Sequence, residues 1–309
     1  MVLTIEQGKE ERSGSAFEYA FIAALSRRIH VNPIESVALA RAKQKYDTSA
    51  HRNHFLKCAE SAVEYIAKKD LRIVSSEPKK LFLNSSRAAQ SNHDVRDVVL
   101  QGSTHTIGFS CKVNNQDLRH SRLSKTIDFV REWGLDSSGA SRAYWKSVEP
   151  VFGRLHQLRE RGLDWIEEYP SLASRRRHVL APVLDAWALE IDRVASSDST
   201  VPEKLCRYVL GSKSYWKVIS NRGNVLVQNF NLEGDMPGKT LAMPSKFLGI
   251  SIREKSSVRE RVVAFGGEYS FGFRLHTASS HIENSLKFAV KGLTLPGEIK
   301  TVKIPIRDR

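Results

Sequence analysis

Cysteine is scarce in this chain, and its placement excludes two kinds of site. The 309 residues include three cysteines, Cys58, Cys111 and Cys206, which are far apart and odd in number. A disulfide framework needs paired cysteines, and a zinc site built on CxxC needs two of them close together in the sequence. The sequence therefore indicates neither.

Long apolar runs are also missing. No run approaches the roughly 18–20 residues that span a bilayer, so we expect no membrane partner. The opening stretch, MVLTIEQGKEERSGS, is polar and charged and lacks the apolar core of a secretory signal. The hydrophobic fraction of 41% is enough for a sizeable core. We expect a cytoplasmic, globular protein.

Acidic residues are in the minority. The chain has 34 Asp and Glu against 48 Lys and Arg, which gives a net charge of +14 and a pI near 9.7. Such a balance favours a polyanion as partner, although a merely solvated basic surface is the alternative. The basic residues are spread along the chain and not gathered in one block. This spread is typical of a folded protein that surrounds its ligand.

Hydrophobic spacing predicts a mixed α+β, or α/β, protein. At the second expected helix, Asn32 fits the N-cap and Pro33 the first helical position. A break at 195–200 separates a helical region, 1–200, from a β-rich region, 201–309, unless both form one compact domain. The expected helices are 16–29, 32–46, 54–69, 123–134, 141–162 and 180–195, and the expected strands are 98–101, 106–113 and several from about 215 onward.

One expected hairpin carries the residues of most chemical interest. VVLQ (98–101) and TIGFSCKV (106–113) are short β-forming segments separated by a Gly-Ser turn. Strand alternation places Ile107, Phe109 and Cys111 on one face and Gly108, Ser110 and Lys112 on the other. Asp97 begins the first strand and Lys112 ends the second. If the strands pair, these two side chains lie close together.

A carboxylate beside a lysine is the arrangement that metal-dependent phosphodiester hydrolysis needs. The carboxylate holds Mg²⁺, and the lysine orients or activates the attacking water. The pattern resembles the PD-(D/E)xK nucleases, but no proline precedes Asp97, and Ser110 stands where a second acidic residue is usual. Asp94, Glu18 and, more weakly, Asp117 are candidates for the missing carboxylate. A purely structural hairpin is the competing interpretation.

Several collinear blocks resemble the HaeIII family of type II restriction endonucleases. They extend from about residue 14 to about residue 293, so the resemblance covers nearly the whole chain. The principal blocks are GSAFEYA (Gly14–Ala20), DVRDVVL (Asp94–Leu100), IGFSCK (Ile107–Lys112), RHSRLSKTIDF (Arg119–Phe129), VPEKLCRYVLG (Val201–Gly211) and FGFRLHTASSHIENSLKF (Phe271–Phe288).

The resemblance implies a Mg²⁺-dependent endonuclease that cuts double-stranded DNA at GGCC and leaves blunt ends, GG|CC. It also implies a PD-(D/E)xK-like core with a small mixed sheet flanked by helices, and a companion cytosine-C5 methyltransferase. Asp97 matches the family's metal-binding residue and Lys112 its catalytic lysine. Glu18 falls where the family has a helical glutamate, so it is the first choice for the displaced carboxylate. Asp94 matches an acidic position and is a further metal candidate.

Recognition of GGCC needs donors for guanine N7 and O6, which arginine supplies best. Arg122, with His120 and Ser121 beside it, follows the catalytic hairpin, while Arg274 and His276 alternate on one later strand. We expect these five residues to contact DNA, although contacts to phosphate alone are the commoner kind. A β-rich 201–309 region would then serve recognition.

Two other functions fit the same residues. A non-catalytic, sequence-specific DNA-binding protein could retain the nuclease scaffold without cleavage. A nuclease with a different target could retain the chemistry. The sequence also leaves open whether a monomer or a homodimer acts on the palindrome.

Overall fold

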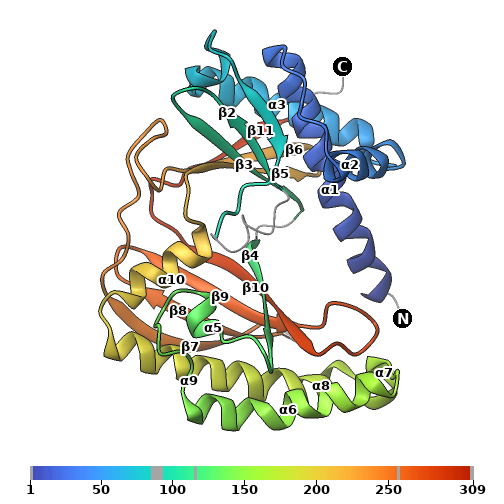
Figure 1. The fold of residues 1–309 in the computed structure, drawn as a ribbon, viewed down its shortest axis with the longest axis vertical. Coiled ribbons are helices and arrows are strands. Elements are labelled where there is room, and N and C mark those ends of the chain that lie inside the picture. Colours follow the sequence, from blue (N-terminus) through green and yellow to red (C-terminus); the bar gives the residue numbers. More distant parts are fainter. Residues whose placement is uncertain (1–2, 85–92, 115–116, 256–257, 307–309) are drawn as a thin grey trace. The chain divides into compact units, whose positions relative to one another are not determined.

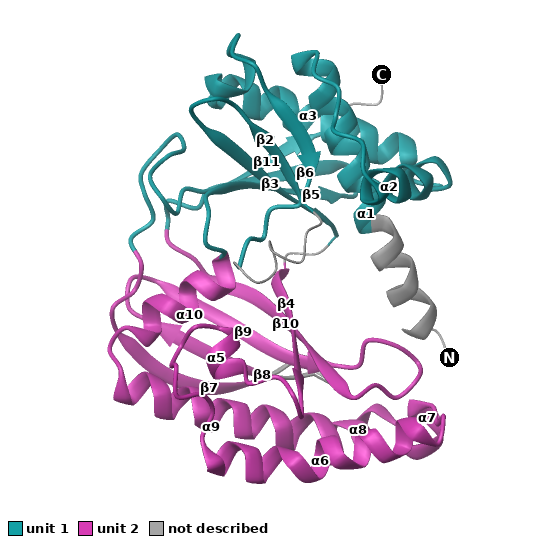
Figure 2. Cartoon of the chain, in the orientation of Figure 1, with its two compact units in different colours: residues 1–116, 211–242, 297–309 teal, residues 117–210, 243–296 magenta. Residues whose placement is uncertain are grey.

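Two units, each assembled from separate stretches of sequence, make up the chain (Figures 1 and 2). Unit 1 comprises residues 1–116, 211–242 and 297–309, and unit 2 comprises 117–210 and 243–296. The predicted boundary at residue 200 falls inside unit 2, and the assignment of DNA recognition to 201–309 stays a prediction. The computed structural model describes residues 3–84, 93–114, 117–255 and 258–306, with backbone only for 3–13, 254, 255, 258 and 259.

A six-stranded mixed sheet is the centre of unit 1. The strand order is β1-β2-β3-β5-β6-β11, with β3 parallel to β5 and every other pair of neighbours antiparallel. The elements are α1 (Leu3–Ile29), α2 (Val37–Asp47), α3 (Arg52–Lys69), the 3-10 turn η1 (Leu71–Val74), β1 (Lys80–Leu83), β2 (Val98–Gln101), β3 (Thr106–Val113), β5 (Tyr215–Asn221), β6 (Asn224–Phe230) and β11 (Thr301–Pro305).

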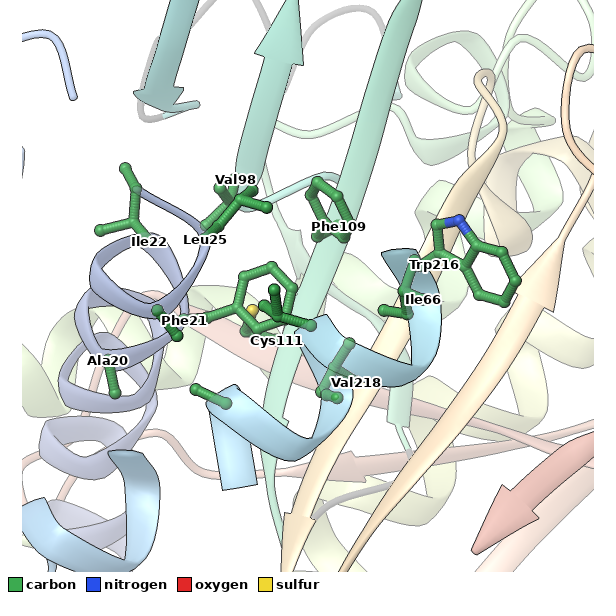
Figure 3. Close-up of a cluster of buried hydrophobic side chains, with 14 of the residues drawn as sticks. Ala20, Phe21, Ile22, Leu25, Ile66, Val98, Phe109, Cys111, Trp216 and Val218 are labelled. Atoms are coloured by element: carbon green, nitrogen blue, oxygen red, sulfur yellow. The ribbon is translucent and has the colours of Figure 1, made fainter. Parts of the chain in front are cut away.

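Helices α1 and α3 close one face of this sheet. Phe21 of α1 packs on Phe109 of β3 with ring centroids 4.9 Å apart, and Phe17 meets Phe55 of α3 at 5.7 Å. Figure 3 shows these helices contributing side chains to one buried cluster with Cys111 and its strand neighbours. The apolar packing fixes how α1 lies against β3, and α1 carries Glu18.

A five-stranded antiparallel sheet, ordered β4-β10-β9-β8-β7, forms unit 2. Trp187 of α9 closes one of its faces, with ring centroids 4.5 Å from Phe273 and 5.1 Å from Phe288. The elements are β4 (Asp117–Ser124), α5 (Phe129–Glu132), α6 (Arg142–Glu160), α7 (Trp165–Glu168), α8 (Leu172–Arg175), the π-helical turn η2 (Arg176–Leu180), α9 (Ala181–Ser197), α10 (Val201–Leu210), β7 (Phe247–Lys255), β8 (Val258–Phe265), β9 (Tyr269–His276) and β10 (Ser285–Thr294).

Mixed α/β architecture is confirmed, although the first helix begins at Leu3, earlier than the predicted residue 16. Two further predicted helix starts are wrong. The second helix begins after Ser36, whose side chain accepts from Leu39 N, because Pro33 instead forms a β-bridge with Leu81. The helix predicted at 123–134 is reduced to the short α5, because residues up to Ser124 belong to β4. In both cases pairing with a strand distant in the sequence replaces the predicted helical residues: Pro33 bridges Leu81, and β4 pairs with β10. None of the helices in the described residues is long and apolar enough to cross a membrane.

Candidate active site

The β2–β3 hairpin forms as the sequence predicts. Val98 pairs with Phe109 and Leu100 with Ile107 in antiparallel register. Ile107, Phe109 and Cys111 lie in the core beneath α1 and α3, which confirms the predicted alternation. Ser110 and Lys112 therefore project from the opposite face of β3.

Three donors converge on one carboxylate oxygen of Asp97. Its Oδ2 accepts from Lys112 Nζ at 3.0 Å, from the Cys111 backbone N–H at 2.7 Å and from Ser110 Oγ at 3.2 Å. The backbone is fixed as well, since Asp97 N donates to Phe109 O at 2.7 Å. Ser110, which departs from the nuclease motif, thus supports the carboxylate instead of adding another. The predicted proximity of Asp97 and Lys112 is confirmed.

Glu18 joins this pair from α1. It lies one helical turn before Phe21, on the side of α1 that packs on β3. Burial, and then the negative charge of Asp97, raise the pKa of Glu18 from 4.5 to about 7, while Lys112 opposes the rise. The structure therefore brings Glu18, Asp97 and Lys112 within electrostatic reach of one another.

Lys112 is held in its charged form. Burial lowers its pKa, but the charges of Asp97 and Glu18 and the hydrogen bond to Asp97 raise it more, so the net pKa lies above its usual value. A lysine in this state donates hydrogen bonds and contributes positive charge at neutral pH. It does not supply a free base.

Two carboxylates that repel each other fit a divalent cation. Mg²⁺ is commonly bound through one or two carboxylates, with waters and substrate phosphates completing its coordination. Asp97 and Glu18 match that donor set, and the pKa of Glu18, raised by burial and then by the charge of Asp97, shows the cost of burying this carboxylate beside Asp97 without a cation. No cluster of three or more His, Cys, Asp or Glu suited to a metal occurs among the residues that the structure describes.

Asp94, the other predicted metal ligand, has different partners. Its carboxylate forms an ion pair of 2.7 Å with Arg96 and accepts from Asn84 Nδ2 at 3.1 Å. The side chain of Asp94 is only 11% exposed. The structure therefore groups Asp94 with Arg96, whereas Glu18 and Asp97 interact with Lys112.

Four of the five predicted DNA contacts share one face of the unit 2 sheet. Arg122 of β4 and His276 of β9 both pair with residue 287 of β10, and His120 and Arg274 both pair with Ala289. Partners in one register row point to the same side, and so do rows two residues apart. This face, opposite the one that α9 closes, is called the basic face below.

Ser121 is the exception among these five. It pairs with Phe288 of β10, which is fully buried and contacts Trp187. Ser121 therefore belongs to the face that α9 closes, opposite His120 and Arg122. The structure does not bring it to the basic face.

Two of the four residues of the basic face have an acidic partner. Arg122 pairs with Glu283 at 2.6 Å, and Asp117 Oδ2 lies 3.9 Å from His120 Nε2. Arg274 forms no ion pair or hydrogen bond with any described residue. Burial, followed by the charges of Arg274, Lys287 and His120, lowers the pKa of His276 to about 4. His276 is therefore neutral at physiological pH, and its Nδ1–H donates to the Thr277 carbonyl at 3.1 Å.

Sequence reasoning missed Lys287, which occupies the row between Arg122 and His276. It alternates with the buried Leu286 and Phe288, so the period-2 pattern of SLKF already indicated that it faces away from the core. Without the register, nothing linked it to β4 and β9.

Comparison with known proteins gives a consistent result. The model of the HaeIII restriction endonuclease family matches residues 14–296. The type II restriction enzyme HaeIII of Haemophilus aegyptius is 27% identical over 322 aligned positions, which cover 96% of this chain and 98% of that protein. No solved structure gives a significant match.

A first prediction concerns the charge of Glu18. Because its folded pKa of about 7 exceeds 4.5, the stability it contributes is present below pH 4.5 and is lost as pH rises to about 7. Without metal, Glu18→Gln should raise the free energy of unfolding at pH 8 by roughly 1–3 kcal/mol and change it little near pH 4.5. Denaturant titration at both pH values measures this.

The exposed Glu35 supplies the control, since Glu35→Gln removes one carboxylate outside the site. It should leave the pH profile unchanged. A lower stability of Glu18→Gln at pH 8 would show that the Glu18 charge stabilises the fold, contrary to the pKa shift.

Proposed function

The chain belongs to the HaeIII restriction endonuclease family, and on this basis we propose that it is a type II restriction endonuclease that hydrolyses double-stranded DNA with Mg²⁺ at GGCC, leaving blunt ends. The observation that carries the chemistry is the convergence of Lys112, Cys111 N–H and Ser110 on Asp97. The proposal includes a PD-(D/E)xK-like active site and a companion cytosine-C5 methyltransferase for the same sequence.

Each residue of the site has a distinct part in this proposal. Asp97 and Glu18 would hold Mg²⁺. When bound, the ion polarises the phosphoryl oxygen and lowers the pKa of a coordinated water. Lys112 orients the attacking water by hydrogen bonding and offsets the negative charge that develops on phosphorus. The raised pKa of Lys112 supports this cationic part over that of a general base.

The basic face would bind the target duplex. Arg122 and Arg274 have planar guanidinium groups suited to guanine N7 and O6. Glu283 and Ser285 both bind Nη1 of Arg122, at 2.6 and 2.7 Å, which fixes that side chain and leaves its other nitrogens for DNA. Neutral His276, with Nδ1–H already used, offers Nε2 as an acceptor for the amino group of cytosine. Ser121 as a direct contact stays a prediction.

Digestion of unmethylated phage DNA tests the function as a whole. With Mg²⁺ we expect discrete fragments whose sequenced ends are blunt and fall at GG|CC. Tight binding at GGCC without cutting would favour the non-catalytic DNA-binding protein. Cutting elsewhere would keep the active site and reject the target. Prior treatment of the DNA with a GGCC-specific cytosine-C5 methyltransferase should abolish cutting.

Replacement of Lys112 tests the division between chemistry and binding. Lys112→Ala should lower the cleavage rate by at least about 100-fold, because a donor to the transition state is lost. Binding of GGCC duplex with Ca²⁺ in place of Mg²⁺ should remain within a few-fold of wild type.

Lys303, exposed on β11 of the same sheet, gives a matched control. Lys303→Ala should cleave at the wild-type rate. Loss of binding together with cleavage in Lys112→Ala would show that Lys112 is structural.

Replacement of Arg274 tests base reading by the basic face. If Arg274 contacts guanine, Arg274→Ala should weaken GGCC binding by roughly 1–3 kcal/mol and reduce discrimination against a single-base variant of the site. Competition binding with Ca²⁺ measures both quantities. Equal weakening on all sequences would assign Arg274 to phosphate instead.

Arg159→Ala provides the control for lost charge, since Arg159 is exposed on α6 of the same unit. It should leave both affinity and discrimination unchanged. Unchanged binding by Arg274→Ala would remove this residue from the interface.

A further inference from the structure

A tight ion pair stands at the entry to β2, directly before Asp97. Arg96 Nε donates to Asp94 Oδ1 at 2.8 Å and Arg96 Nη2 to Asp94 Oδ2 at 2.7 Å. The backbone N–H of Arg96 also donates to Oδ1, at 3.0 Å, and Asn84 donates to Oδ2. The side chains of Arg96 and Asp94 are 14% and 11% exposed. The guanidinium is therefore held in one orientation.

Gly108 makes room for this arginine on the active face of β3. A Cβ at position 108 would lie 1.8 Å from Arg96 Cδ and 2.5 Å from Arg96 Cγ. The aliphatic part of Arg96 thus crosses β3 where a side chain would otherwise project. By strand alternation this is the face that carries Ser110 and Lys112, both of which bond to Asp97 there.

A second Asp-x-Arg pair in the same unit, Asp70 with Arg72, differs from Asp94 with Arg96 in the bonds that the third guanidinium nitrogen makes. Arg72 Nε and Nη2 donate to Asp70 in the same way, at 2.8 and 2.6 Å. Nη1 of Arg72 then donates to the carbonyl of Asp235, so all three guanidinium nitrogens donate within the protein. Nη1 of Arg96 bonds to none of the described residues, and it is not among their buried unpaired atoms. One donor edge of Arg96 is left for a ligand.

We propose that Arg96 binds a phosphate of the DNA backbone next to the one that is hydrolysed, and that Asp94 is a positioning residue that holds the guanidinium for it. This inference rests on the proposed nuclease function. A fixed, planar guanidinium suits a phosphate oxygen, because little side-chain entropy is lost on binding. Such a contact sets the register of the strand at Asp97 and reads no base.

Salt dependence of binding tests the contact. Affinity for a GGCC duplex would be measured over a range of salt concentrations, with Ca²⁺ in place of Mg²⁺. Loss of one phosphate contact should reduce the slope of log K against log salt by about 0.9, with similar weakening on non-target DNA. We expect this for Arg96→Ala. We also expect it for the double variant Asp94→Ala/Arg96→Ala, which keeps the net charge and leaves no unpaired carboxylate.

Arg72→Ala is the matched control, because it breaks the equivalent pair, in which all three guanidinium nitrogens of the arginine bond within the protein. It should lower stability, followed by thermal unfolding, and leave the salt slope unchanged. If Arg96→Ala does not fold, the double variant carries the comparison.

A second measurement locates the phosphate. Duplexes with a neutral methylphosphonate at single positions would be bound by wild type and by the double variant. At the position that Arg96 contacts, the substitution should weaken wild-type binding about 10-fold and have no further effect on the variant, because the same contact is already absent. Gly108→Ala, which displaces Arg96 sterically, should behave like the variant, and Gly14→Ala, with no atom near the added methyl, like wild type.

The outcomes separate the two proposals. An unchanged salt slope in the double variant, or equal methylphosphonate effects at every position in both proteins, would overturn the role of Arg96 while leaving the nuclease function intact. A wild-type protein with no affinity for DNA at low salt would overturn both.

Discussion

Convergence of three donors on Asp97 Oδ2 is the interaction on which the candidate active site depends. A carboxylate at the edge of an apolar hairpin loses hydration, and it is tolerated when hydrogen bonds replace the lost water. Here the replacements come from consecutive residues of one strand, Ser110, Cys111 and Lys112. The antiparallel register that sets Val98 opposite Phe109 brings them to Asp97. A shift of one residue would turn Ser110 and Lys112 toward the core.

This arrangement also gives a physical reason for serine at position 110. Asp97 and Glu18 already outnumber Lys112 as charges, and burial with Asp97 raises the pKa of Glu18 to about 7. A third carboxylate at 110 would face Asp97 directly and increase that repulsion. Serine instead donates a hydrogen bond to Asp97, and the second carboxylate comes from α1, which the contact between Phe21 and Phe109 holds against β3.

The sequence predicts those features that depend on contacts between residues close together in the chain, and not those that depend on distant ones. The hairpin, its alternation and the contact of Asp97 with Lys112 depend on residues within one short segment, so period and turn signals were sufficient. Glu18 came from the family resemblance, because its place beside Asp97 depends on packing across 79 residues. The missed strand β4 depends on β10, whose Ser285 pairs with Ser124, and no local apolar alternation marks the charged face of β4. Residues 211–242 and 297–309 belong to unit 1 although residues 117–210 of unit 2 precede them, and no local sequence pattern predicts this assignment.

Both units close one side of a sheet by aromatic packing and gather repelling charges beside that packing. The packing is Phe21 on Phe109 in unit 1 and Trp187 on Phe273 in unit 2. In unit 1, Glu18 comes from the packed helix α1, and burial together with the charge of Asp97, at the entry to β2, raises its pKa to about 7. In unit 2, the side opposite α9 gathers cations whose charges, after burial, help to lower the pKa of His276 to about 4. Like charges that repel one another destabilise the folded state, so their removal should stabilise a chain that has no ligand for them. The proposed nuclease function accounts for both groups of charges, because a phosphate backbone would meet the cations and a metal-assisted reaction would use the carboxylates.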